Sequence, residues 1–298
     1  IVGGGVSGLG AAVYSARFNM KTLILAAQPG GLFIAEHPVE NYPGFKKIIA
    51  VDLVKNIREH AEEFGAELKE ETVKEIKKDN NLFSIKTNKS LYQAKSVLIA
   101  TGSERRKLNA PGEKEFLGKG VSYCASCDGA FFQDKIVGVI GGGDSAAKEA
   151  LLLAKYAKKV YIIYRKDAIR AEPVLIDEIS KNSKIEIINN ADVIEIKGDL
   201  FVESVKLSRK FGDSDELKLN GLFIEIGHVP ATALVKNLEV QLNERGEIVV
   251  DKESKTNVPG VFAAGDITNN GWKQAIIAVS QGCYAAFSAF RYINSIDK

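Results

Sequence analysis

A glycine-rich turn between an apolar strand and a helix occurs twice in this chain, and the repetition limits the folds it can adopt. The first turn, Gly3 to Gly8, leads into an alanine-rich helix expected over 9–18 and a strand over 22–25. The second, Gly141 to Ala146, follows an apolar strand over 136–140 and leads into a helix expected over 147–156 and a strand over 160–164. Such turns let a backbone approach a pyrophosphate at a helix N-terminus. We predict an α/β chain with two Rossmann-like dinucleotide-binding domains.

The two turns begin 138 residues apart, about one domain, and the same succession of elements follows each. A hairpin is expected after each unit (72–87 and 191–208), and then an apolar strand that ends in Gly102 or Gly227. The tail adds a strand ending in Gly265-Asp266 and a helix over 274–293, which we assign to the first domain. The first domain (1–106 and 230–298) is therefore interrupted by the second (107–229).

Composition excludes several classes of function. The 298 residues carry a net charge of +2, which is too small an excess of basic residues to indicate binding to nucleic acid or to an acidic membrane surface. No run approaches the ~18 apolar residues of a membrane helix, and the start does not resemble a signal peptide, so we expect a cytoplasmic protein. Because Ile1 and Val2 alone precede the first turn, we expect that a few N-terminal residues, including the initiator, are missing.

Two thiols, Cys124 and Cys127, stand three residues apart and are followed at once by Asp128. A Cys-x-x-Cys near a βαβ pattern is typical of redox chemistry. Zinc needs four ligands, whereas the remaining candidates (Cys283, His37, His60 and His228) are scattered without paired spacing. We predict no metal site, a packing role for Cys283, and no catalytic histidine.

A basic turn, 165–170, follows the strand expected over 160–164. Arginine near this point of a dinucleotide domain suits the 2′-phosphate of NADPH, whereas an acid there would bind the ribose of NADH. Lys166 keeps the charge but lacks the bidentate fork of arginine. The sequence therefore favours NADPH in the second domain.

Taken together, these motifs resemble those of the low-molecular-weight thioredoxin reductases. The resemblance covers nearly the whole chain, and its most specific element is the run Cys124 to Asp128. It rests on these segments: Gly3 to Gly8, Gly30-Gly31, Val39 to Phe45, Ala100 to Gly102, Cys124 to Asp128, Gly141 to Ala146, Gly265-Asp266, and Lys273 to Ala275. It implies FAD in the interrupted domain, NADPH in the inserted one, thioredoxin or a thioredoxin-like disulfide as substrate, and a homodimer.

The resemblance also implies site residues. For FAD they are Gly3, Gly5, Ser7, Gly8, Gly31, Leu32, Asn41, Val73, Thr101, Gly102, Gly265, Asp266, Lys273, Gln274 and Ala275. For NADPH they are Gly141, Gly143, Asp144, Ser145, Ala146, Arg165, Lys166, Arg170 and Gly227. Three departures from the family pattern stand out: Leu32 replaces a glutamine, Tyr164 a histidine and Lys166 an arginine.

By family analogy Cys127 faces the flavin, Cys124 attacks the protein substrate, and Asp128 exchanges protons with the thiols. Since both cysteines precede the second glycine turn, they belong to the NADPH domain, and we expect this domain to rotate about its two linkers. Two alternatives stay open. One is a flavoprotein reductase or oxidase for another acceptor (peroxiredoxin-linked or a small dithiol), and the other is a redox sensor without turnover.

Overall fold

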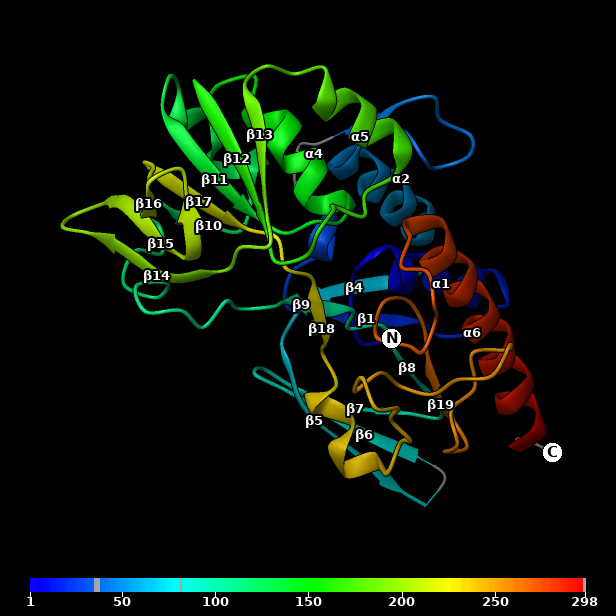
Figure 1. Cartoon of the computed structure of the whole chain (residues 1–298). Helices are drawn as coiled ribbons and strands as arrows, with labels where there is room; N and C mark the ends of the chain where they lie inside the picture. Colours follow the sequence, from blue (N-terminus) through cyan, green and yellow to red (C-terminus); the bar gives the residue numbers. More distant parts are fainter. Residues whose placement is uncertain (35–37, 81, 297–298) are drawn as a thin grey trace. The chain divides into compact units, whose positions relative to one another are not determined.

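The computed structural model describes residues 1–34, 38–80 and 82–296 (Figure 1). The chain divides into two compact units. Unit 1 is Ile1–Glu104 with Val229–Lys298, and unit 2 is Arg105–His228. The sequence predicted that the chain passes between its two domains at 106/107 and 229/230.

Unit 1 is built around a parallel sheet. Strand β1 (Leu23–Ala26) pairs with β4 (Glu67–Glu70), and β8 (Val97–Ile99) pairs with β19 (Val261–Ala263). Val2 joins the two pairs through parallel bridges to Leu25 and Ile99. The first residues of the chain therefore lie in the middle of the sheet.

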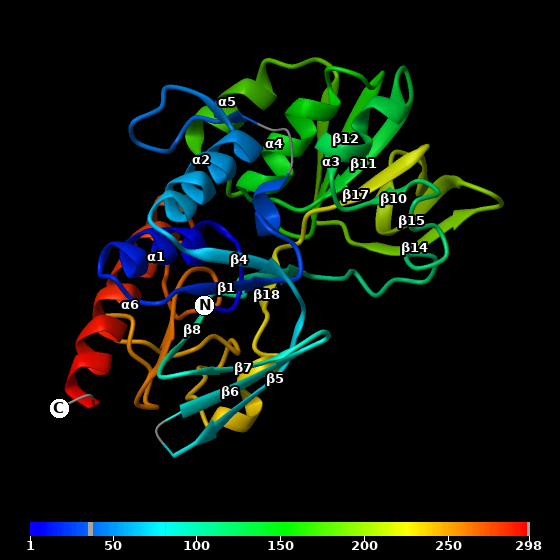
Figure 2. The same cartoon turned by 180° about the vertical axis from the view of Figure 1, so that it is seen from behind.

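Two helices of unit 1, α1 (Val6–Arg17) and α6 (Ala275–Ile296), lie side by side in both views (Figures 1 and 2). Their close approach depends on Gly282, where a Cβ would lie 2.1 Å from the carbonyl oxygen of Ser7. Through this contact α6 packs against the first glycine turn, although the two are far apart in the sequence.

The remaining elements of unit 1 are short or peripheral. They are η1 (Gly31–Ile34), β2 (Pro38–Val39), β3 (Ile48–Ile49), α2 (Ala50–Glu63), β5 (Val73–Asp79), β6 (Leu82–Thr87), β7 (Leu91–Ala94) and η3 (Ala233–Leu238). Strands β5, β6 and β7 form an antiparallel sheet that contributes Ile76, Phe83 and Ile85 to the core. The hairpin predicted over 72–87 is its first half.

Unit 2 contains a five-stranded parallel sheet in the order β10-β17-β11-β12-β13. Its strands are β10 (Val121–Ser122), β17 (Gly221–Ile224), β11 (Ile136–Ile140), β12 (Lys159–Tyr164) and β13 (Ile185–Asn189). Its helices are α3 (Ala125–Asp128), η2 (Gly129–Phe132), α4 (Asp144–Leu153) and α5 (Pro173–Ser180). A separate antiparallel sheet holds β14 (Val193–Gly198), β15 (Val202–Phe211) and β16 (Ser214–Lys218). The observed sheets agree with the predicted α/β class.

Both glycine turns end sooner than the sequence suggested. Helix α1 begins at Val6 and α4 at Asp144, three residues before the expected starts at 9 and 147. The last residues of each glycine motif already form the first helical turn. Their backbone N–H groups are consequently the orphan donors of that helix.

The two connections between the units are short strands, β9 (Ser103–Arg105) and β18 (His228–Pro230), which pair with each other. Within the described residues, no helix combines the length and apolar character needed to cross a membrane.

Candidate functional site

Unit 1 contains an open pocket of about 590 Å³ at the first glycine turn. Most residues predicted to hold FAD line it: Gly3, Gly5, Ser7, Gly31, Leu32, Val73, Thr101, Gly102, Asp266, Lys273, Gln274 and Ala275. They come from segments at both ends of the chain, which the parallel sheet brings together. The cavity size lies within the range of small-molecule sites.

Three glycines of the first turn, Gly3, Gly5 and Gly8, differ in what surrounds them. Gly3 has φ +115°, and a Cβ there would lie 2.2 Å from the carbonyl oxygen of Ala100. A Cβ at Gly8 would lie 2.1 Å from the carbonyl oxygen of Gly3, whereas one at Gly5 would meet nothing within 4 Å. Gly3 and Gly8 therefore permit the turn, while Gly5 leaves open space for a ligand.

Three predicted residues do not line the cavity. Gly8 is packed inside the turn, and Gly265 donates its N–H to Gln281 at 3.0 Å. Asn41 donates from Nδ2 to Oε1 of Gln274 at 3.0 Å, so it contacts the lining without being part of it.

Several residues that the sequence did not single out for the site also line the cavity, among them Gln28, Glu71 and Thr72. Glu71 accepts hydrogen bonds from Thr87 Oγ1 at 2.6 Å and from Tyr92 OH at 2.9 Å. The Thr87 bond holds the pKa of Glu71 below its usual value. No motif marks this acid, because its partners come from two other strands.

The second glycine turn lies in unit 2 between β11 and α4. Gly141 has φ +144°, and its Cβ would lie 2.1 Å from the carbonyl oxygen of Glu225, whereas a Cβ at Gly143 would meet nothing within 4 Å. Asp144 accepts the N–H of Glu172 at 2.8 Å. Ser145 is exposed and Ala146 buried in the first turn of α4. Gly143 in the second turn thus corresponds to Gly5 in the first, because each has open space at its Cβ position.

The predicted basic turn follows β12. Arg165, Lys166 and Arg170 are exposed, and Arg170 Nε donates to Tyr164 OH at 3.0 Å. A Cβ placed on Gly142 would lie only 2.5 Å from the nearest atoms of the Tyr164 ring, so the ring packs directly against this glycine. Tyr164, which replaces the family's histidine, therefore links the glycine turn to Arg170. Gly227 has φ +96° and open space at its Cβ position.

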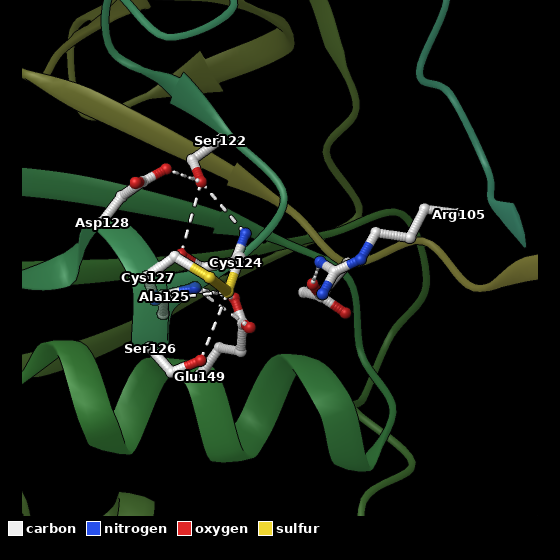
Figure 3. The surroundings of a disulfide bond; sticks show 9 residues. Arg105, Ser122, Cys124, Ala125, Ser126, Cys127, Asp128 and Glu149 are labelled. Atoms are coloured by element: carbon white, nitrogen blue, oxygen red, sulfur yellow. Dashed lines mark hydrogen bonds and ion pairs between the residues drawn. A yellow bond between two sulfur atoms is a disulfide. The ribbon is translucent and has the colours of Figure 1, made fainter. Parts of the chain in front are cut away.

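Cys124 and Cys127 form a disulfide with their Cα atoms 5.3 Å apart (Figure 3). Cys124 caps helix α3, because its sulfur accepts the N–H of Cys127 at 3.2 Å. Ser126 Oγ lies 3.3 Å from the same sulfur. Cys124 is partly buried, whereas Cys127 is exposed.

Asp128 contacts the dithiol turn through Ser122. The Ser122 hydroxyl donates to Asp128 Oδ2 at 2.6 Å and accepts the N–H of Cys124 at 3.0 Å. The sequence indicated Asp128 but not Ser122, which reaches it from β10.

A second carboxyl group approaches the turn from α4. Both side-chain oxygens of Glu149 lie 3.1 Å from the nitrogen of Ala125 (Figure 3). Near it, Arg105 donates to Glu225 Oε1 at 2.8 Å. The sequence did not mark these three residues, because packing alone brings them to the dithiol.

The other thiol, Cys283, and His60 belong to unit 1, whereas the disulfide belongs to unit 2. Burial raises the pKa of Cys283 on α6, and the His60 ring contacts Phe64 with 5.4 Å between centroids. His37 lies outside the described residues. Among the residues described, no three His, Cys, Asp or Glu side chains are arranged to hold a metal ion.

Comparisons with known proteins place these features in a family. The model of the pyridine nucleotide-disulphide oxidoreductase family matches residues 1–282. Thioredoxin reductases of Peptoclostridium acidaminophilum and Treponema pallidum are each 41% identical to this chain, over 99% and 100% of it and 96% and 97% of their own lengths.

Solved structures give the same result. The crystal structure of Lactococcus lactis thioredoxin reductase (FR conformation) matches with a TM-score of 0.95 and 38% identity, over 99% of this chain and 98% of that one. That of T. acidophilum thioredoxin reductase matches with a TM-score of 0.92 and 42% identity, over 99% and 97%. The resemblance inferred from the motifs is confirmed. The chain belongs to the pyridine nucleotide-disulphide oxidoreductase family.

Proposed function

We propose that this protein is an NADPH-dependent thioredoxin reductase that passes electrons through FAD to the Cys124–Cys127 disulfide and on to the disulfide of thioredoxin. The observation that carries the proposal is the disulfide itself, in the same unit as a second dinucleotide turn. Full-length relatives named thioredoxin reductase support the choice of acceptor.

The unit 1 cavity fits FAD. Gly5 leaves room for the close approach of a pyrophosphate, and the N-terminus of α1 supplies free N–H groups for it. Asp266 lines the same cavity and would accept hydrogen bonds from the hydroxyls of the ribityl chain. Lys273, Gln274 and Ala275, at the start of α6, would face the flavin pyrimidine. When bound, FAD supplies a two-electron relay between a hydride donor and a disulfide.

Unit 2 fits NADPH. The turn from Gly141 to Ala146 and the N-terminus of α4 would hold the pyrophosphate. The exposed cations Arg165, Lys166 and Arg170 would bind the 2′-phosphate. Arg170 is held by Tyr164 at 3.0 Å, which orients its guanidinium beside the glycine turn.

The dithiol turn supplies the residues that act on the protein substrate. Cys124, as a thiolate, would attack the substrate disulfide and form a mixed disulfide, which Cys127 then resolves. The family roles of the two sulfurs stay a proposal. The exposure of Cys127 suits a sulfur that receives electrons from a group outside its own unit. Asp128, oriented by Ser122, would accept and return the thiol protons.

Domain rotation, a homodimer and a cytoplasmic location stay predictions of the sequence. An anaerobic titration of the purified flavoprotein with NADPH, followed by addition of thioredoxin, tests the function. We expect a flavin band near ~450 nm that NADPH bleaches and that oxidised thioredoxin restores. Restoration by a peroxiredoxin or a small disulfide, and not by thioredoxin, would overturn the choice of acceptor. A colourless protein that binds NADPH would favour the sensor.

A further inference from the structure

Glu149 lies directly against the backbone of the redox turn. Both of its carboxyl oxygens are 3.1 Å from the nitrogen of Ala125, the residue between Cys124 and Ser126. Ala125 is 1% exposed, so this N–H depends on Glu149 for its hydrogen bond. Figure 3 shows the side chain rising from α4 to the turn that carries the disulfide.

The position places an acid beside two sulfurs that gain negative charge on reduction. The N–H groups at a helix start stabilise a thiolate. Here one of them, that of Ala125, is bonded to a carboxyl group. An ionised carboxylate raises the free energy of a nearby thiolate, whereas a protonated carboxyl group does not.

Burial and the charged groups around Glu149 together determine which protonation form it takes. The charged groups are Glu225 and Arg105, joined at 2.8 Å, and Asp128 on α3. Burial, with Glu225 adding to it, raises the pKa of Glu149 to about 8. Burial also raises the pKa of Glu225, and the Arg105 guanidinium paired with it at 2.8 Å opposes that rise. With its own pKa raised to about 8, Glu149 is mostly protonated near neutral pH.

We propose that Glu149 is a positioning residue of the Cys124–Cys127 redox centre, which fixes the turn through Ala125 and makes the reduction potential of the dithiol depend on its own protonation. The inference rests on the redox role of this disulfide in the proposed function. Glu149 differs in this from Asp128, which contacts the turn through Ser122 on β10.

Reduction breaks the S–S bond and takes two electrons, which NADPH supplies as a hydride in the proposed function. With one proton the product is a thiol and a thiolate, and with a second proton it is two thiols. Where Glu149 is ionised in the disulfide form, the new thiolate raises its pKa, and Glu149 takes up one further proton from water.

The sign of the effect follows from this linkage. Below about pH 7, Glu149 is protonated in both redox states and adds no pH dependence. Above its oxidised-state pKa of about 8, the disulfide becomes harder to reduce than in a variant that never ionises. At pH 9 the linkage gives up to about a tenfold smaller reduction equilibrium constant, or about 30 mV for a two-electron couple.

The test compares the full-length flavoprotein with Glu149→Gln, whose amide oxygen still accepts the Ala125 N–H. Each protein is equilibrated with oxidised and reduced dithiothreitol from pH 6.5 to 9. The thiols are then alkylated under denaturing conditions and counted by mass, with Cys283 as the constant background thiol. Between pH 6.5 and pH 9, we expect the offset between wild type and Glu149→Gln to change by up to about tenfold in the equilibrium constant, with wild type becoming the harder protein to reduce.

Glu178→Gln is the matched control, since it removes an exposed carboxylate of α5 in the same unit. Its curve should follow that of wild type. An offset of Glu149→Gln that stays constant across pH, or no offset at all, would overturn the proposal, as would a disulfide that the buffer does not reduce. NADPH and thioredoxin are absent from this assay, so failure of the proposed function appears separately in the NADPH titration.

Discussion

Ser122 Oγ and Asp128 Oδ2 are 2.6 Å apart, although the two residues stand on opposite sides of Cys124 in the sequence. The same hydroxyl accepts the N–H of Cys124 at 3.0 Å. A single side chain from β10 therefore fixes the Asp128 carboxylate relative to the backbone of the first redox cysteine.

Replacement of Asp128 by Asn should slow disulfide reduction about 100-fold, which is typical for loss of a general acid–base group. Flavin reduction by NADPH should stay unchanged, because Asp128 takes no part in hydride transfer to FAD. Stopped-flow absorbance separates the two steps. Ser122→Ala should have a smaller effect, since the carboxylate remains but loses its orientation. Wild-type turnover by Asp128→Asn would contradict the role.

Cys124→Ser should abolish thioredoxin reduction while NADPH still bleaches the flavin, since Cys124 is the sulfur that attacks the substrate. Steady-state turnover with thioredoxin and anaerobic absorbance measure the two activities. Cys283→Ser is the matched control, because this thiol lies on α6 in unit 1. Unimpaired turnover by Cys124→Ser would refute the assignment.

The glycines of the first turn should respond differently to alanine. Gly5 has φ −78° and open space at its Cβ position, so Gly5→Ala should fold normally but lose flavin affinity. Gly8→Ala would place its methyl group 2.1 Å from the Gly3 carbonyl oxygen and should destabilise the fold itself. Flavin content after gel filtration and the urea midpoint distinguish the effects. An unaltered flavin content in Gly5→Ala would argue against FAD in this cavity.

Arg165→Gln should raise the KM for NADPH by about 10- to 100-fold, the size expected for a lost charge-assisted hydrogen bond. The KM for NADH should not change, because NADH lacks the 2′-phosphate. Lys166→Arg should lower the KM for NADPH by restoring a bidentate fork. Lys158→Gln, at an exposed lysine outside the turn, serves as the control. Equal effects on both coenzymes would exclude a phosphate contact.

Glu149 should also make stability depend on pH. Its folded-state pKa of about 8 exceeds the unfolded value of about 4.3. An acid with a raised pKa costs stability as pH rises between these two values. Glu149→Gln should therefore be more stable than wild type at pH 8.5, by on the order of 2 kcal/mol, and the difference should shrink toward pH 5. Urea unfolding at the two pH values measures it, and a pH-independent difference would contradict the raised pKa.

The parts of the fold that the sequence predicted are those that local chemistry determines. The residues that define a glycine turn, an apolar run or the Cys-x-x-Cys motif are close together in the sequence. For this reason β11 was predicted with its observed bounds at Ile136 and Ile140. The helix starts after both turns were three residues late, because glycine and serine in a first helical turn look like loop residues.

The unpredicted part of the site comes from tertiary packing. Glu149 looks like any polar position on α4, yet the packing of α3 against α4 brings it to Ala125. Arg105 and Glu225 are 120 residues apart and meet at 2.8 Å. Residues of this kind carry no spacing signal in a single sequence.

The chain leaves unit 2 close to the point where it enters. There the N–H of Arg106 donates to the carbonyl oxygen of Gly227 at 2.9 Å. An insertion with adjacent ends imposes little closure entropy on its host. We therefore expect the parallel sheet of unit 1 to tolerate exchange of the intervening segment, and a tight turn could bridge the gap if that segment were excised. Modular replacement of the electron-donor specificity is therefore an engineering route that the topology leaves open.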